Sequence, residues 1–335
     1  MKKIKILPII ILAFAVILPV FVSSSYIIQS LVMILLYAYW ASSWNIIGGY
    51  AGHLSLGHAT YAGIGAYTST VLFSTFGVSP WIGMLVGGLL GGLLSIIIGY
   101  PCFKLKGSYF TLATIALLYV VQIVFMSEDK IFGFTTNGAM GMSIPLKGES
   151  FVAMQFMDKR YYYYIALAML VIVMIVSNIV KSSKMGYYLA AITTNQDAAS
   201  SLGVNVPVTK LKAQFISAFF TAIGGTFYAQ LIMFIDPTRI LGYDLSLQMA
   251  MFVIIGGRAT VWGPVIGALM LVPINELTRS YLGAGQAGLS VVVYGIILMA
   301  AIYFMPFGIE GHLKKLAIFI RSKLPGKISQ KEGIQ

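Results

Sequence analysis

Residues 181–212 read KSSKMGYYLAAITTNQDAASSLGVNVPVTKLK, a polar segment that separates two long apolar stretches of the chain. Asn195 is suited to cap a helix, because its side-chain oxygen can accept a hydrogen bond from a free amide of the first turn. Asp197 follows where a carboxylate suits the positive end of the helix dipole. A helix is therefore expected to begin directly after Asn195.

The end of this helix is marked as clearly as its start. Gly203 fits the left-handed position after Leu202, and Pro207 stands a few residues beyond. The punctuation predicts a short helix over residues 196–202. Four lysines flank it: Lys181, Lys184, Lys210 and Lys212. Taken alone, the segment fits an ordinary amphipathic connector as well as a surface shaped for a partner protein.

The composition identifies the class of protein. The chain has 335 residues, of which 59% are hydrophobic and 10% are charged, whereas soluble domains carry about 25% charged residues. Long apolar runs recur, which indicates an all-α polytopic membrane protein, since a β-barrel would show short alternating segments. Glycines at positions 83, 87 and 91 are spaced four apart and predict close helix packing within the chain.

The apolar runs predict about ten transmembrane helices. They cover residues 6–22, 26–44, 59–76, 81–100, 108–126, 161–180, 213–235, 245–257, 262–277 and 288–305. The first run resembles a signal peptide, but further spans follow at once, and we interpret it as an uncleaved span. The eighth and ninth runs are short for the roughly 20 residues that a crossing needs, so one of them is expected to be broken or re-entrant.

The distribution of charge predicts the orientation. With the N-terminus in the cytoplasm, 16 of the 22 basic residues fall on the cytoplasmic side, as the positive-inside rule requires. The remaining six are Lys130, Lys147, Lys159, Arg160, Arg239 and Arg279. Both termini and segment 181–212 are then cytoplasmic, and loop 127–160 is external. We expect a membrane domain over residues 1–310 and a basic tail over 311–335. The net charge of +12 follows from this asymmetry and does not indicate nucleic-acid binding.

Several kinds of chemistry are missing from the sequence. The predicted spans contain no Asp, Lys or Arg, and their only Glu is Glu276 at a span end, which disfavours ion-coupled transport. No GxxxxGK[ST] or HExxH motif occurs, and the single Cys102 excludes an internal disulfide. We therefore predict no catalytic residue, metal site or cofactor on this chain. A transport pathway powered by a separate subunit fits these absences best. An intramembrane enzyme or scaffold is less well supported, because the sequence contains no set of catalytic residues.

Several motifs now carry a family resemblance. NIIGGYAGHLSLGHATYAGIGAY at 45–67 resembles the pattern GYxGxxSLGHxxFxxxGAY of permeases from branched-chain amino acid ABC importers. KLKGSYFTLATI at 104–115, TNGAMGMSIP at 136–145 and IGGRATVWGPVIGA at 255–268 resemble further motifs of that family in the same order. The chain departs from the family at Ala259, where relatives usually have Gly, and at Lys104 and Lys106, where they have Arg.

The resemblance implies an ABC importer permease fold in a prokaryotic cell membrane. It implies a second permease subunit, similar or identical, two ATP-binding subunits that hold ATP and Mg, and an extracytoplasmic substrate-binding protein. Segment 187–203 then becomes the element that couples the permease to the ATPase. The residues we assign to coupling are Gly186, Asn195, Asp197, Ala199, Leu202, Gly203 and Pro207.

Uncharged polar residues in or beside the spans are candidates for the translocation pathway, because a zwitterionic cargo needs only weak polar contacts. They are Asn45, His53, Ser55, His58, Tyr61, Thr111, Thr114, Gln214 and Gln248. For each one, helix–helix hydrogen bonding is the competing explanation. The glycine-rich region 45–65 is expected to form non-helical backbone beside the cavity. Import of urea, short amides or sugars by the same architecture stays open, as does a stand-alone carrier or channel.

Overall fold

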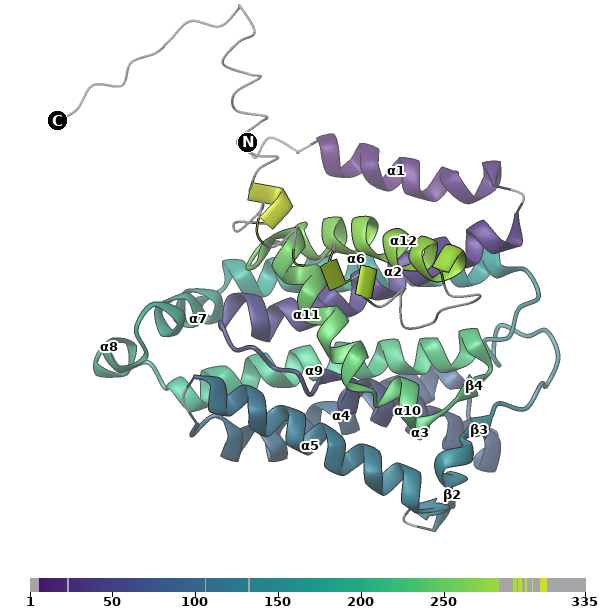
Figure 1. Cartoon of the computed structure of the whole chain (residues 1–335), viewed down its shortest axis with the longest axis horizontal. Helices are drawn as coiled ribbons and strands as arrows, with labels where there is room; N and C mark the ends of the chain where they lie inside the picture. Colours follow the sequence, from purple (N-terminus) through teal and green to yellow (C-terminus); the bar gives the residue numbers. More distant parts are fainter. Residues whose placement is uncertain are drawn as a thin grey trace, which may run out of the picture.

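The computed structural model describes residues 6–22, 24–105, 107–131, 133–282, 292–293, 295–296, 299, 303 and 308–311. Its long helices run side by side along the long axis of the molecule (Figure 1). In chain order they are α1 (Ile6–Phe21), α2 (Ser25–Asn45), α3 (His58–Phe76), α4 (Pro80–Cys102), α5 (Ser108–Ser127), α6 (Lys159–Ser182), α9 (Val206–Ile232), α11 (Tyr243–Gly257) and α12 (Gly263–Leu282). These nine helices coincide with the first nine predicted spans. The tenth, 288–305, and the tail 311–335 lie largely outside the described residues.

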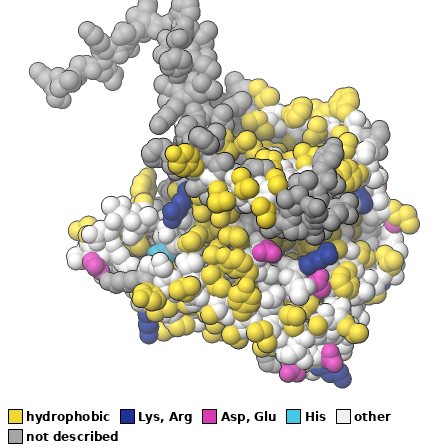
Figure 2. All heavy atoms as spheres, viewed as in Figure 1, with side chains coloured by type: hydrophobic (Ala, Val, Ile, Leu, Met, Phe, Trp, Pro, Cys, Tyr) yellow, Lys and Arg dark blue, Asp and Glu magenta, His cyan; other side chains and the backbone are white. Residues whose placement is uncertain are grey.

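Length and composition support a membrane location for this bundle. Within the described residues, six helical segments are long and apolar enough to cross a membrane: 25–50, 80–102, 108–127, 159–182, 206–232 and 237–257. Hydrophobic side chains cover much of the face seen in Figure 2. The segment 237–257 is broken, because α10 (Pro237–Ile240) ends at Leu241 and α11 begins at Tyr243. The predicted eighth span, 245–257, lies within α11 and the ninth, 262–277, largely within α12, and both helices are continuous. The expectation that one of these spans is broken or re-entrant stays a prediction.

Glycine allows the central helices to touch. A Cβ on Gly225 of α9 would lie 1.9 Å from the carbonyl oxygen of Ala62 on α3, and a Cβ on Gly65 of α3 would lie 1.9 Å from that of Ala222 on α9. Only glycine permits such an approach of two backbones. Helix α4 packs against this pair of helices as well, because its Gly87 faces the backbone of Gly65 on α3. The predicted packing of the α4 glycines within the chain is confirmed.

The charged residues lie at the two ends of the bundle as the sequence predicts. At one end, Lys181 Nζ donates to the carbonyl of Ala259 and Arg258 Nε donates to that of Gly48. At the other, Lys147 Nζ donates to the carbonyl of Phe73 and Arg160 reaches the carbonyl of Val22. These four basic residues thus stand at the ends to which the charge count assigned them.

Loop 127–160 has its own structure. β1 (Lys130–Ile131) pairs with β2 (Phe134–Thr135), and Asn137 turns the chain in the left-handed region ahead of the one-turn helix η2 (Gly138–Met140). β3 (Met142–Ser143) pairs with β4 (Phe234–Ile235), which follows α9. We call this loop the 127–160 cap. The β3–β4 pairing connects the 127–160 cap to the end of α9, and the cap lies at the end of the bundle opposite the short helices α7 and α8 (Figure 1).

Ala259 stands where the family resemblance expects glycine. It follows the end of α11 with φ of 58°, in the left-handed region. That conformation brings a Cβ too close to the following carbonyl, at a cost of about 1–2 kcal/mol. The departure from the family pattern therefore falls on a strained backbone position.

We expect Ala259→Gly to stabilise the protein by about 1 kcal/mol, because glycine adopts a positive φ without that steric cost. Ala113→Gly, inside helix α5, is the matched control and should destabilise by about 1 kcal/mol. Thermal unfolding in detergent, followed by tryptophan fluorescence, measures both. A lower midpoint for Ala259→Gly would contradict the assignment of strain.

Candidate functional site

The predicted helix between the spans exists and is capped as expected. α8 (Gln196–Ser201) begins after Asn195, whose Oδ1 accepts hydrogen bonds from the amides of Asp197 and Ala198, both at 3.0 Å. It ends in a left-handed Gly203 with φ of 85°. The amide of Val204 donates to the carbonyl of Ala199, and that of Gly203 to the carbonyl of Ser200. These paired bonds fix the geometry of the helix end.

A second short helix joins α8 to the bundle. α7 (Lys184–Thr194) follows α6 after a sharp turn at Ser183. Gly186 permits this turn, because a Cβ there would lie 2.3 Å from the carbonyl oxygen of Lys181. We call residues 184–205 the α7–α8 hairpin.

The two halves of the α7–α8 hairpin are packed differently. Leu189 of α7 is fully buried in an apolar cluster of the bundle, whereas α8 is held by little apolar contact. Ala199 is buried against Ile192 of α7 and Val206 of α9, and these three form a cluster separate from the main core. Pro207 occupies the first turn of α9, after Asn205, whose side chain accepts from the amide of Val208. Leu202, by contrast, is 86% exposed, and Tyr187 is exposed too. An apolar tip that nothing in the described chain covers is suited to contact another protein.

A chain of buried hydrogen bonds crosses the middle of the bundle. Ser217 Oγ of α9 donates to the carbonyl of Ser43 at 2.7 Å. Its single proton is therefore used, and His58 Nε2 must donate to Ser217 Oγ at 2.8 Å. His58 Nδ1 then accepts from Ser55 Oγ at 3.0 Å. All four residues are buried, so the histidine is a neutral link between α2, α3 and α9.

The segment between α2 and α3 is irregular over residues 46–57 only, and residues 58–65 of the predicted non-helical region 45–65 belong to α3. The π-helix η1 (Ile46–Tyr50) leads into loop 51–57, which turns back beside α2, since Trp44 Nε1 donates to the carbonyl of Ser55. Thr111 and Thr114 of α5 hold this loop through the carbonyl of Leu54 and the amide of Leu56. The free backbone groups of a non-helical segment are thereby satisfied inside the bundle.

His53 lies in loop 51–57, outside the helices. Its Nδ1 donates to the carbonyl of Ala51 at 2.7 Å. Burial, and then the positive charge of Lys210, lower the pKa of His53 to about 4 against the opposing effect of the Ala51 bond; Arg258 lowers it as well. The ring is therefore neutral at physiological pH.

Two further candidates make interhelical bonds. Gln214 Nε2 of α9 donates to the hydroxyl of Tyr61 on α3 at 2.9 Å. Asn45 bridges α2 to the segment after α11, with Nδ2 donating to the carbonyl of Thr260 and Oδ1 accepting from the amide of Ala259. Both are buried, and both bonds fit the structural explanation.

The nine pathway candidates thus divide into two groups. Asn45, Ser55, His58, Tyr61, Thr114 and Gln214 are buried within the chain. His53, Thr111 and Gln248 are partly exposed and stay candidates for contact with cargo. The described residues contain no group of three or more His, Cys, Asp or Glu that could hold a metal.

Sequence analysis missed the partners of these residues. Ser217 lies 159 positions from His58 and Trp44 lies 11 positions from Ser55, and no local signal marks either partner. Thr193 of α7 was also missed, although its Oγ1 donates to the carbonyl of Tyr50 at 3.1 Å. Such pairs follow from the packing of helices, which only the three-dimensional structure specifies.

Comparison with known proteins gives consistent matches. A family model described as "Branched-chain amino acid transport system / permease component" matches residues 26–302. The high-affinity branched-chain amino acid transport system permease protein LivM of Escherichia coli (strain K12) is 26% identical over 256 residues, which cover 71% of this chain and 60% of that protein. The probable permease LivH of Methanocaldococcus jannaschii is 24% identical over 275 residues, 75% of this chain and 81% of LivH.

Sugar permeases match too. The ribose import permease protein RbsC of Haemophilus influenzae is 28% identical over 198 residues, 58% of each chain. No solved structure matches the chain. The chain therefore spans only about 60% of the length of the LivM and RbsC relatives.

We expect Ser217→Ala to destabilise the protein by about 1–3 kcal/mol, because His58 Nε2–H would lose its acceptor in a dry interior. Ser95→Ala is the matched control: Ser95 is as deeply buried but bonds only the carbonyl of Gly92 one turn earlier on α4. Chemical unfolding in detergent would compare them. An equal loss of unfolding free energy in the two variants would show that the hydrogen bonds of His58 contribute no more to stability than the local bond of Ser95.

Proposed function

Because this chain belongs to the branched-chain amino acid transport system / permease component family, we propose that it is the membrane pathway subunit of an ATP-driven importer. Cargo would cross beside its helices, and separate subunits would hydrolyse ATP. The family description names a permease component, which confirms the prediction that the chain is not itself an ATPase. The observation that carries the proposal is the α7–α8 hairpin, a capped element with an uncovered apolar tip.

The hairpin is suited to receive force from a partner. Its caps fix the shape of α8, and Leu189 anchors α7 in an apolar cluster that includes Ala213 of α9, so a displacement of the hairpin would be passed to the bundle. Leu202 and Tyr187 offer apolar contact, and α8 leads through Asn205 directly into the central helix α9. We infer that an ATP-binding subunit docks here and that this end of the bundle is cytoplasmic.

The opposite end is suited to a substrate-binding protein. Large apolar side chains of the 127–160 cap are exposed there: Met140, Leu146, Phe151, Val152 and Met157. Strand pairing between β3 and β4 connects this cap to the end of α9. Docking of a loaded binding protein on the cap would therefore act on the same helix that the hairpin acts on from the other side.

The cargo we propose is a branched-chain or other hydrophobic amino acid. LivM, LivH and RbsC are named for branched-chain amino acids and for ribose, so import of sugars is the main alternative, with urea and short amides beside it. The described interior offers neutral hydrogen-bonding groups, and His53, Thr111 and Gln248 would meet the cargo where a second, similar or identical permease completes the pathway.

The decisive experiment measures ATP hydrolysis stimulated by substrate. The chain would be reconstituted in liposomes with its partner permease, the ATP-binding subunits and the binding protein loaded with leucine, ribose or urea. Leucine should stimulate hydrolysis and be imported, and a Gly-Ser linker in place of residues 196–202 should abolish both. Leu202→Asp should weaken stimulation, and Leu202→Met, which keeps an apolar tip, should not.

Two outcomes would contradict the proposal in different ways. Stimulation by ribose or urea alone would correct the cargo and leave the mechanism standing. Transport by the chain alone, without ATP or partner subunits, would replace the importer by a stand-alone carrier.

A further inference from the structure

A buried lysine connects the α7–α8 hairpin to the bundle. Lys210, in the second turn of α9, is only 2% exposed. Its Nζ donates to Oε1 of Gln196, the first residue of α8, at 2.8 Å. Taking an ammonium group out of water is costly unless it is hydrogen-bonded. The Lys210–Gln196 bond therefore resists separation of α8 from α9.

The same ammonium group faces an aromatic cluster. Lys210 Nζ lies 5.8 Å from the centre of the Phe103 ring, at the end of α4, within the range in which a cation is attracted to a ring face. Phe103 stacks on Phe110 of α5 with ring centres 5.1 Å apart. His53 of loop 51–57 meets the two rings edge-on, at 5.6 Å and 5.3 Å. Contacts thus run from α8 through Lys210 to loop 51–57.

The hairpin holds this loop at a second point. Besides its bond to the Tyr50 carbonyl, Thr193 of α7 packs against Gly52, where a Cβ would lie 2.9 Å from Thr193 Cγ2. α7 therefore contacts Tyr50, directly before loop 51–57, and Gly52 within it, and the aromatic cluster contacts the loop at His53. Movement of the hairpin would reach the loop from two sides.

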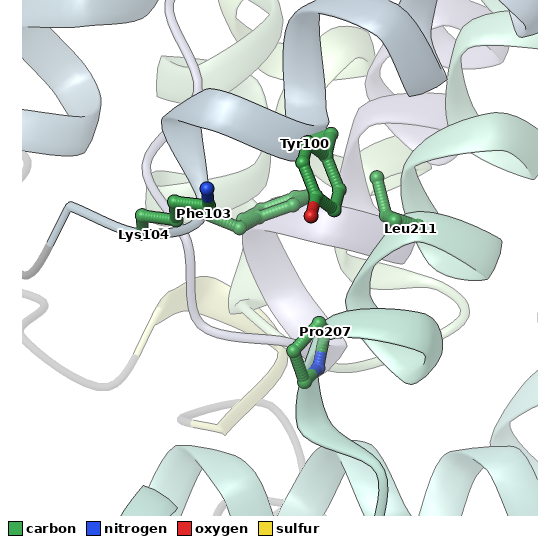
Figure 3. A pocket seen from close by; sticks show the side chains of 5 residues that line it. All are labelled: Tyr100, Phe103, Lys104, Pro207 and Leu211. Carbon is green, nitrogen blue, oxygen red and sulfur yellow. The ribbon is translucent and has the colours of Figure 1, made fainter.

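Phe103 has space beside it. It forms one wall of a small cleft between the end of α4 and the start of α9, lined also by Tyr100, Lys104, Pro207 and Leu211 (Figure 3). One side of the cluster therefore borders open space instead of packed protein.

We propose that Lys210 is a positioning residue that transmits movement of α8 to loop 51–57, and through it to the pathway. The inference rests on the proposed function, since it assigns the route by which an ATPase-driven shift of the hairpin reaches the interior. It separates two tasks within this end of the protein: the exposed tip binds the partner, and the buried ammonium carries the motion inward.

The test is the coupling ratio, the amount of substrate imported per ATP hydrolysed, in the full reconstituted importer. Lys210→Met keeps the length of the side chain and removes its charge. It should lower the ratio by about fivefold or more, with ATP hydrolysis retained. Lys212→Met, an exposed neighbour on the same helix, is the matched control and should keep the wild-type ratio.

Variants of the partner residue identify the bond itself. Gln196→Glu keeps an acceptor for Lys210 and should keep the coupling ratio. Gln196→Leu should lower the ratio, and combining it with Lys210→Met should add little, because both remove one interaction. Gln196→Leu also serves if Lys210→Met does not yield folded protein, since Gln196 lies on the short outer helix.

The outcomes are distinct. An unchanged ratio in Lys210→Met, or a proportional loss of hydrolysis and import, would overturn the inference, the second because it would place Lys210 in ATPase docking. Additive losses of the coupling ratio when Gln196→Leu and Lys210→Met are combined would overturn the inference as well. Failure of the wild-type complex to couple ATP to import at all would instead refute the proposed function.

Discussion

The close approach of α3 and α9 is the constraint on which the rest of the structure depends. Gly65 and Gly225 let the two backbones touch at carbonyl oxygens of the opposite helix. That contact brings Ser217 within reach of His58 and Gln214 within reach of Tyr61. In lipid, where polar groups need internal partners, these bonds are available only because the helices lie so close.

Helix α9 connects the two ends of the bundle. The helix begins at the α7–α8 hairpin, passes the His58 chain, and ends at the strand that pairs with the opposite cap. A displacement at either end therefore reaches a tightly packed element and not a flexible linker. Such an arrangement fits the proposed function, in which the pathway would respond to an ATP-binding subunit on one side and to a loaded binding protein on the other.

Much of the local structure could be predicted from the sequence, because its causes are local. The caps of α8 follow from Asn195 and Gly203, and the spans follow from apolar runs of sufficient length. The same reasoning could not find the Ser217–His58 bond, whose partners lie 159 positions apart. It also treated Lys210 as one of four flanking charges, whereas the fold buries it. Basic residues near a membrane are ordinarily exposed, and only the docking of α8 onto α9 reverses this.

The candidate site shows the same division. The glycines of region 45–65 predicted the irregular backbone of residues 46–57, but not that residues 58–65 form the start of α3 or which side chains face inward. Most of the pathway candidates bond other groups within the chain, either on a neighbouring helix or in an adjoining loop. A polar residue in a membrane helix is first a structural group, and exposure within the assembled fold decides whether it can also meet cargo.

The central claim is that an ATP-binding subunit docks on the tip of the α7–α8 hairpin. The most direct measurement places a photo-crosslinking amino acid at Leu202, or at Met157 on the opposite cap, in cells that express the whole importer. The account predicts a crosslink from position 202 to the ATP-binding subunit and none from position 157. A crosslink to that subunit from 157, with none from 202, would contradict both the docking site and the orientation of the chain.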